Sequence, residues 1–232
     1  MKLFQHNTLA ALMSGLYEGT LTIGELLKKG NFGIGTLSGI NGELIVLDGK
    51  AYIATGDKKV RQVEDNETVP YAAVSHHEAT LSFQQEEKIA SEELFKKIEN
   101  EFNSENTFYT IKMTGDFDMM HVRMAPGAAE GEPFAKVAEN QPEYKEENVM
   151  GTIVGFWTPE LFHGVSVAGY HLHFLADSCN FGGHILGFTG FSGKVEIGQV
   201  DALEQNFPTK SQNFLQAKFN LDQLKKDIEQ AE

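Results

Sequence analysis

Three histidines lie close together in the segment GYHLHFLADSCNFGGH, residues 169–184. Because side chains alternate along a strand, His171 and His173 point to the same face. The residues LADSCNFGG that follow have the composition of a turn, and a reversal within them brings His184 opposite His173. Cross-strand neighbours have Cβ atoms about 5 Å apart. The spacing therefore predicts three imidazoles that converge on a divalent metal, with other positions open for a carboxylate, water or substrate.

The alternative is that these histidines are structural, as a lone histidine in a strand usually is. Asp177 is the only carboxylate nearby in the segment, and burying several imidazoles without partners is costly. This cost favours the metal site. Zinc is favoured over iron or manganese, although imidazole suits several divalent metals. The remaining histidines have no partner at ligand spacing and are expected to be structural: His6, His76, His77, His121 and His163.

Composition limits the classes of partner. The chain has 232 residues and a formal net charge of −14, so phosphate backbones and anionic membrane surfaces are unfavourable partners. A single cysteine, Cys179, excludes an intrachain disulfide and a thiolate zinc site, and fits a reducing compartment. The N-terminal apolar run is interrupted by polar residues, which favours mature protein over a signal peptide. No segment has the length and apolarity of a membrane span.

Helical and strand patterns position this segment within an α+β protein. Helices are expected at residues 22–30, where Thr22 and Glu25 have capping-box spacing, at 90–102, where Ser91 is the expected cap, and at the C-terminus from Asn220. Glycine-punctuated runs rich in Val, Ile and Phe predict many short strands, with an antiparallel meander after residue 150. We expect two β-rich subdomains of mixed or antiparallel sheet. We expect residues 1–145 to form the first and residues 146–232 to form an antiparallel second that carries the metal site; the alternative is that both belong to one compact unit.

Several longer motifs resemble one known family. GYHLHF and GGHILGF match its histidine segment, YEGTLTIGELLKKGNFGIGTLSGINGELIVLDGKAY resembles its N-terminal signature, and FYTIKMTGDFDMMHVRM resembles its middle strand pair. The chain is similar in these respects to the acetolactate decarboxylases over nearly its whole length. The segment RMAPGAAEGEP departs from the family pattern after the arginine, which affects the neighbouring loop.

The resemblance implies an activity, a cofactor and a set of site residues. The family decarboxylates 2-acetolactate to acetoin and carbon dioxide with a bound zinc ion. Carried over by position, His171, His173 and His184 would bind zinc, with Glu43 as a further ligand or a proton donor. Arg123 would dock the substrate or stabilise the developing charge, and Thr36 would line the pocket. The resemblance also implies a homodimer. We expect the protein in the cytoplasm and, from its charge, expect it to bind neither nucleic acid nor membrane.

A glutamate near the family's C-terminus reaches the metal region, and two residues here match it. At about 100° per residue, Glu232 lies roughly 50° from the centre of the apolar stripe of the C-terminal helix, and Glu229 roughly 110°. The apolar stripe is expected to pack on the body of the protein, so the side chain nearer the stripe is the one that faces it. This favours Glu232 as the catalytic carboxylate. Whether Glu43 or Glu232 donates the proton is left open by the sequence.

Two other classes of protein fit the histidines. The pattern His171-x-His173, followed by Asp177, imitates the metal motif of cupin-like oxygenases and isomerases. Asp177 replaces the usual glutamate of that motif, and His184 follows too soon for its second half. A non-enzymatic β-rich module with a structural metal is the other alternative. Structural zinc sites usually close all four positions, often with cysteines, and only one cysteine is present here.

Overall fold

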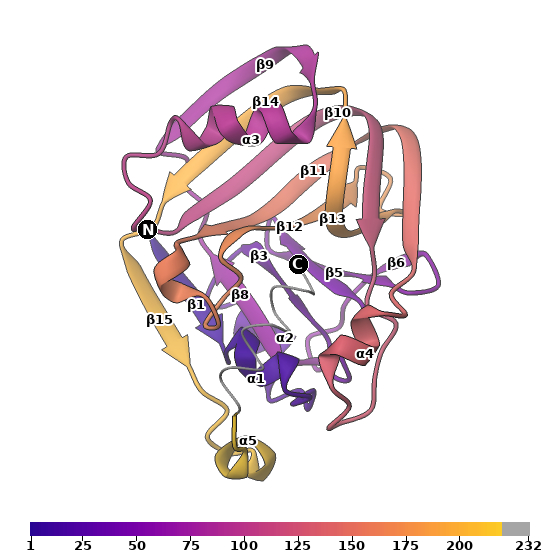
Figure 1. Ribbon diagram of the computed structural model, residues 1–232, viewed down its shortest axis with the longest axis vertical. Coiled ribbons are helices and arrows are strands. Elements are labelled where there is room, and N and C mark those ends of the chain that lie inside the picture. The colour runs from indigo at the N-terminus through magenta and orange to yellow at the C-terminus, as the bar shows by residue number, and fades with distance from the viewer. Residues whose placement is uncertain (220–232) are drawn as a thin grey trace.

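The computed structural model describes residues 1–219 and contains two large β-sheets (Figure 1). The first sheet has seven strands in the order β15-β1-β8-β3-β4-β5-β6. Its only parallel pair is β1 with β15, so among the described residues this sheet is mixed. Its strands are β1 (Lys2–His6), β3 (Phe32–Thr36), β4 (Glu43–Leu47), β5 (Lys50–Thr55), β6 (Lys59–Gln62), β8 (Tyr71–Ser75) and β15 (Ala202–Asn206).

The second sheet has six strands in the order β11-β12-β13-β10-β14-β9, and β10 also pairs with β11. The long strand β10 thus has β11 on one side, and β14 and β13 successively on the other. The strands are β9 (Leu81–Ile89), β10 (Tyr109–Arg123), β11 (Glu143–Thr158), β12 (Gly169–Ala176), β13 (Gly182–Thr189) and β14 (Phe191–Gln199). A small third sheet pairs β2 (Leu21–Thr22) with β7 (Thr68–Val69).

The helices are short and lie around the sheets (Figure 1). They are α1 (Leu9–Met13), α2 (Ile23–Leu26), α3 (Ser91–Glu99), α4 (Phe134–Ala138), α5 (Gln212–Gln216) and the 3₁₀ turn η1 (Glu160–Phe162). The capping box of Thr22 and Glu25 is present, as predicted. The prediction that Ser91 caps α3 is wrong: Ser91 is the first helical residue, and Ala90 at the cap makes no side-chain hydrogen bond. The expected C-terminal helix lies outside the described residues.

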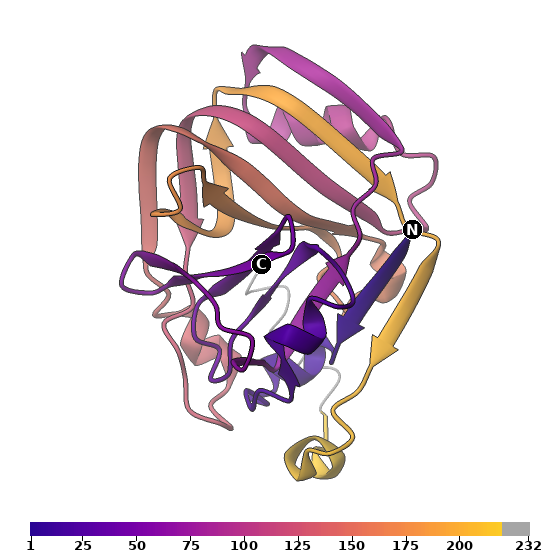
Figure 2. The same cartoon turned by 180° about the vertical axis from the view of Figure 1, so that it is seen from behind.

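The boundary between the two sheets does not coincide with the expected boundary between subdomains at residues 145 and 146. Residue 145 lies inside β11, and strands from before that position, β9 and β10, belong to the second sheet. Conversely, β15 from the C-terminal half pairs with β1 at the edge of the first sheet, as the view from behind also shows (Figure 2). The chain therefore passes from the first sheet to the second between β8 and β9, and returns to the first between β14 and β15.

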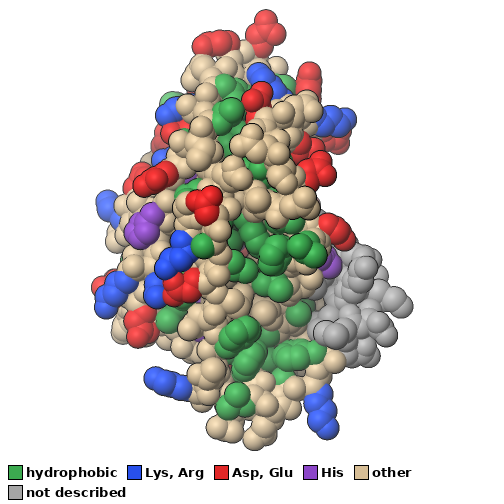
Figure 3. Space-filling model, turned by 90° about the vertical axis from the view of Figure 1, so that its left-hand side faces the viewer, with side chains coloured by type: hydrophobic (Ala, Val, Ile, Leu, Met, Phe, Trp, Pro, Cys, Tyr) green, Lys and Arg blue, Asp and Glu red, His purple; other side chains and the backbone are tan. Residues whose placement is uncertain are grey.

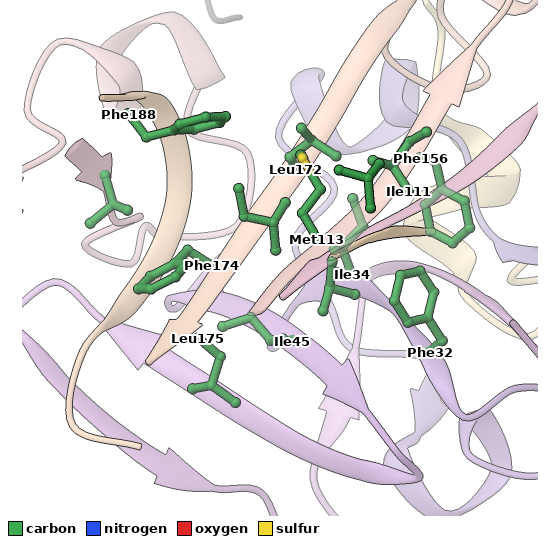
Figure 4. Packing of buried hydrophobic residues seen from close by; sticks show 14 of the residues in the cluster. Phe32, Ile34, Ile45, Ile111, Met113, Phe156, Leu172, Phe174, Leu175 and Phe188 are labelled. Carbon is green, nitrogen blue, oxygen red and sulfur yellow. The ribbon is translucent and has the colours of Figure 1, made fainter. Parts of the chain in front are cut away.

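The main hydrophobic core lies between the two sheets. Side chains of the first sheet, such as Phe32, Ile34 and Ile45, meet side chains of the second sheet, such as Phe156 and Leu172 (Figure 4). Apolar burial of this kind contributes about 25 cal/mol per Å². The packing holds the starts of β4 and β12 against one another, and the candidate site forms there.

Candidate metal centre and active site

The three histidines of the segment 169–184 converge as predicted. His171 and His173 lie on the same face of β12, and His184 on β13 pairs directly with His173. Their ring centroids are 5.1 to 5.5 Å apart. One possible ligand atom from each ring lies within 4.8 Å of the others. These distances suit a shared cation.

A tight turn produces this convergence. The amide of Ala176 donates to the carbonyl of Phe181 at 2.9 Å, and the amide of Cys179 donates to the carbonyl of Ala176 at 2.8 Å. Cys179 has a φ of 51° inside the turn. The chain therefore reverses where the turn composition predicted it, and the hairpin sets His184 opposite His173.

Burial keeps all three imidazoles neutral. Desolvation by burial, helped by the charge of Arg123 and opposed by the hydrogen bond to the carbonyl of Leu44, lowers the pKa of His173 to about 4. Burial and nearby positive charge also hold the pKa values of His171 and His184 well below their usual range. Neutral imidazole is the form that binds metals.

The hydrogen bonding of His173 tests whether the site fits a metal. Its Nδ1 lies 2.8 Å from the carbonyl oxygen of Leu44, so Nδ1 carries the proton and donates it. Its Nε2 then bears a lone pair, and this buried atom has no hydrogen-bond partner among the described residues. A backbone carbonyl that orients one ring nitrogen while the other remains available is the usual arrangement around metal-binding histidines. The donor set therefore fits a divalent metal.

Glu43 reaches the same place from the first sheet. Its Oε1 accepts a hydrogen bond from the amide of Ala125 at 2.9 Å, and its Oε2 lies 3.4 Å from Nε2 of His173. Burial raises the pKa of Glu43 to about 7, against the opposing effects of Arg123 and the Ala125 amide. Because His173 is neutral at pH 7, this contact is not an ion pair. Near neutral pH Glu43 can both hold and release a proton.

Arg123 stands at the end of β10, directly paired with His184. Its Nη2 donates to Nε2 of His184 at 3.1 Å. Its charge acts on all three imidazoles and on Glu43, lowering the pKa of each. The arginine thus places a permanent positive charge beside the histidines.

A cavity opens onto these groups. Its polar wall includes Glu43, Arg123, His171 and His184. The predicted pocket residue Thr36 also lines it, and its Oγ1 donates to the carbonyl of Gly42 at 2.7 Å. The rest of the lining comes from α1, β3, β8, the loop before β4 and the segment after β10: Leu9, Leu12, Met13, Gly35, Ile40, Tyr71, Ala125, Phe134 and Gln141.

Sequence reasoning missed several of these lining residues. Ile40, Tyr71 and Gln141 come from three separate parts of the chain, and no local spacing relates them to the histidines. The predicted carboxylate Glu232 and its alternative Glu229 lie outside the described residues.

The other histidines are apart from this cluster. His6 is hydrogen-bonded to Asn206 and Thr20, and His121 contacts Glu143 at 2.9 Å. His77 is hydrogen-bonded to a threonine, His76 is exposed, and His163 has no hydrogen bond from either ring nitrogen within the described part of the chain. In residues 1–219, only the trio in β12 and β13 brings potential ligands together.

Two sheets that bring three imidazoles, a carboxyl group and an arginine together beside one cavity define a β-rich enzyme with a candidate metal centre. A family model described as alpha-acetolactate decarboxylase matches residues 3–221. The alpha-acetolactate decarboxylase of Lactococcus lactis subsp. cremoris (strain MG1363) is 58% identical over 231 residues, which cover 100% of this chain and 98% of the relative. The chain belongs to the alpha-acetolactate decarboxylase family, a family of carboxy-lyases, and the resemblance seen in the sequence is confirmed.

Solved structures agree with this assignment. The alpha-acetolactate decarboxylase of Bacillus subtilis strain 168 superposes with a TM-score of 0.96 at 31% identity, covering 100% of this chain and 99% of the other. A Staphylococcus aureus protein described as similar to alpha-acetolactate decarboxylase superposes with a TM-score of 0.97 at 43% identity, covering 100% of both chains. The β-rich α+β fold expected from the sequence is thereby confirmed.

Proposed function

We propose that the chain decarboxylates 2-acetolactate to acetoin and carbon dioxide, as a step of acetoin biosynthesis, with zinc as its metal. The observation that carries this proposal is the trio of neutral imidazoles, two of them buried and one half-buried, that lies beside the same cavity as Arg123 and Glu43. The relatives named alpha-acetolactate decarboxylase, at up to 58% identity, support the choice of substrate.

His171, His173 and His184 would hold the metal, and Glu43 is the candidate for a fourth ligand. Neutral histidines leave the charge of the cation largely intact, whereas a carboxylate reduces it. When bound, a divalent ion supplies a Lewis acid that stabilises negative charge developing on substrate oxygen. Zinc suits an all-imidazole set, and another divalent metal is the alternative.

The reaction leaves an electron pair on carbon. The bond between C2 and the carboxylate breaks, carbon dioxide departs, and the electron pair moves from C2 onto the adjacent ketone oxygen to give an enediolate. A planar, permanently charged guanidinium binds a carboxylate or a developing oxyanion well. Arg123, which lines the cavity beside His184, would therefore orient the substrate carboxylate or hold its oxygen atoms.

Acetoin then requires a proton on C2. A carboxyl group with a pKa near the working pH is an efficient donor. In the metal-free protein burial raises the pKa of Glu43 to about 7, and Glu43 lines the cavity, so it is one candidate donor if it does not coordinate the metal. Glu232 is the second candidate predicted from the sequence. Thr36, whose hydroxyl donates to Gly42, would bind substrate as part of the pocket wall.

The apolar side of the cavity completes the proposed site. Leu12, Ile40 and Phe134 are buried and face the same space as the polar groups. Such a wall accommodates the methyl groups of acetolactate and excludes water, which strengthens electrostatic interactions inside the site.

We further propose a cytoplasmic homodimer whose partners are small molecules. The net charge of −14 opposes binding to nucleic acid and anionic membranes. The face in Figure 3 intersperses Lys and Arg with Asp and Glu and has no continuous basic patch. Within residues 1–219, none of the helices has the length and apolarity to cross a bilayer.

The rival classes are less well supported. The cupin-like alternative finds no support in the superposed structures, which match this chain over its full length and bear other names. The alternative of a closed structural site is disfavoured because His171 and His184 line an open cavity.

Incubation of zinc-loaded protein with acetolactate tests the proposal. We expect acetoin to form at a rate that a chelator abolishes and zinc restores, and His171→Ala to be inactive. His76→Ala is the matched control, because His76 is exposed and away from the cavity, and it should be fully active. No acetoin from the zinc-loaded wild type would refute the function, and full activity of His171→Ala would refute the site.

A further inference from the structure

Ile40 has an unusual backbone conformation. Its φ is 48°, in the left-handed region, where β-branched side chains are strongly disfavoured. Its neighbours Gly39 and Gly42 also have positive φ, of 75° and 88°, and glycine is the residue suited to that region. Isoleucine at position 40 is therefore a strained choice in a loop that otherwise uses glycine for this geometry.

The loop is held in this shape by backbone hydrogen bonds on both sides of Ile40. The amide of Gly39 donates to the carbonyl of Tyr17 at 2.8 Å, and the carbonyl of Gly39 accepts from the amide of Ala128 at 2.8 Å. The amide of Gly42 donates to the carbonyl of Ala125 at 3.1 Å. None of these bonds involves the side chain at position 40, so glycine or asparagine would meet the backbone requirement with less strain.

The side chain of Ile40 must therefore account for its presence. It is 2% exposed and packs in a cluster that includes Leu12, Tyr71 and Phe134. All four residues line the cavity that also contacts Glu43, Arg123 and two of the histidines. Strained residues that persist at such a place point to a functional use of the side chain.

We propose that Ile40 is a specificity-determining residue, which sets the size of the alkyl group accepted on the carbon that loses carbon dioxide. This inference rests on the proposed function. The carboxylate, hydroxyl and ketone of the substrate are drawn to the polar wall, and the alkyl group of C2 is left to the apolar wall. The hydrogen-bonded loop prevents Ile40 from moving away when a longer alkyl group enters the cavity.

Truncation of Ile40 tests this inference against a matched neighbour. We would measure kcat/KM for acetolactate and for homologues with ethyl or propyl in place of the C2 methyl, using wild type, Ile40→Ala, Ile40→Gly and Leu37→Ala. Leu37 lies in the same loop and is 5% exposed, but it packs in a different cluster and does not line the cavity. We expect the propyl-to-methyl ratio to rise by about tenfold or more in both Ile40 variants, since a single methylene in an apolar pocket changes selectivity roughly 10- to 200-fold. Leu37→Ala should leave the ratio within about threefold of wild type.

A binding measurement separates this inference from the proposed function. Calorimetry on the zinc-loaded proteins with 2-hydroxy-2-methyl and 2-hydroxy-2-propyl carboxylic acids, which lack the ketone and do not decarboxylate, should show the same shift in preference. An inactive wild type would refute the proposed function, and calorimetry would still test Ile40. An unchanged preference in Ile40→Ala and Ile40→Gly, or an equal change in Leu37→Ala, would overturn the assignment.

Discussion

Replacing Arg123 with methionine should separate catalysis from metal binding. The guanidinium is half-buried beside the cavity, and opposite charges about 4 Å apart attract by about 4 kcal/mol at an effective dielectric constant of 20. Loss of that attraction to the substrate carboxylate or the developing oxyanion predicts a fall in kcat/KM of roughly a thousandfold. Arg123→Lys keeps the charge but not the planar fork, so we expect an intermediate loss.

Zinc affinity should rise in Arg123→Met, although kcat/KM falls. Arg123 lowers the pKa of all three histidines, and its Nη2 donates to Nε2 of His184, where a cation would compete with it. Without this positive charge the trio should bind zinc more tightly. The assays are acetoin formation under steady state and competition with a chromophoric chelator.

The control for this experiment is Arg61→Met. Arg61 forms an exposed ion pair with Glu67 at 2.7 Å and does not line the cavity. We expect it to leave turnover and zinc affinity unchanged. A kcat/KM for Arg123→Met within tenfold of wild type, or weaker zinc binding by that variant, would refute the reasoning.

Three further results are expected. Burial lowers the pKa of His6, so below pH 6.5 the unfolded chain binds a proton that the native protein does not, and the free energy of unfolding decreases as the pH is lowered. Urea titrations should show a shallower decrease in His6→Gln, and identical slopes would contradict this. Phe174→Ala removes a ring that is 0% exposed and should cost about 3–5 kcal/mol in the same titration, whereas Leu161→Ala, at a residue 77% exposed, should cost under about 0.5. Thr22→Ala should lower the free energy of unfolding by about 1 kcal/mol because the helix cap is lost, whereas Thr22→Ser should keep most of this stability. Equal losses in the two variants would exclude the cap as the cause.

Local sequence patterns were sufficient for the histidine trio. Strand alternation places His171 and His173 on one face, and a turn of ordinary composition brings His184 opposite His173. All of this lies within one hairpin, so short-range geometry determines it. The capping box at Thr22 was predictable for the same reason.

Long-range pairing could not be predicted in the same way. The meander expected after residue 150 continues only as far as β13, because β13 pairs with β10 and β14 pairs with another part of β10. The meeting of Glu43 with His173 depends on packing between the two sheets, which no sequence period encodes. Their joint placement was inferred from the family resemblance.

Ile40 shows a further limit of local patterns. Left-handed conformations are expected at glycine and asparagine, and an isoleucine in the sequence GINGEL therefore predicts an ordinary backbone. The hydrogen bonds that impose the conformation come from Tyr17, Ala125 and Ala128, which are distant in the chain. The strain arises from tertiary contacts and becomes visible only in the folded protein.

The most direct test of the central claim is anomalous diffraction at the zinc edge from crystals of the purified protein. The account predicts a single strong peak per chain at about 2.0–2.1 Å from one nitrogen of each of His171, His173 and His184. A peak elsewhere, or crystals grown with zinc that show none between these rings, would contradict it.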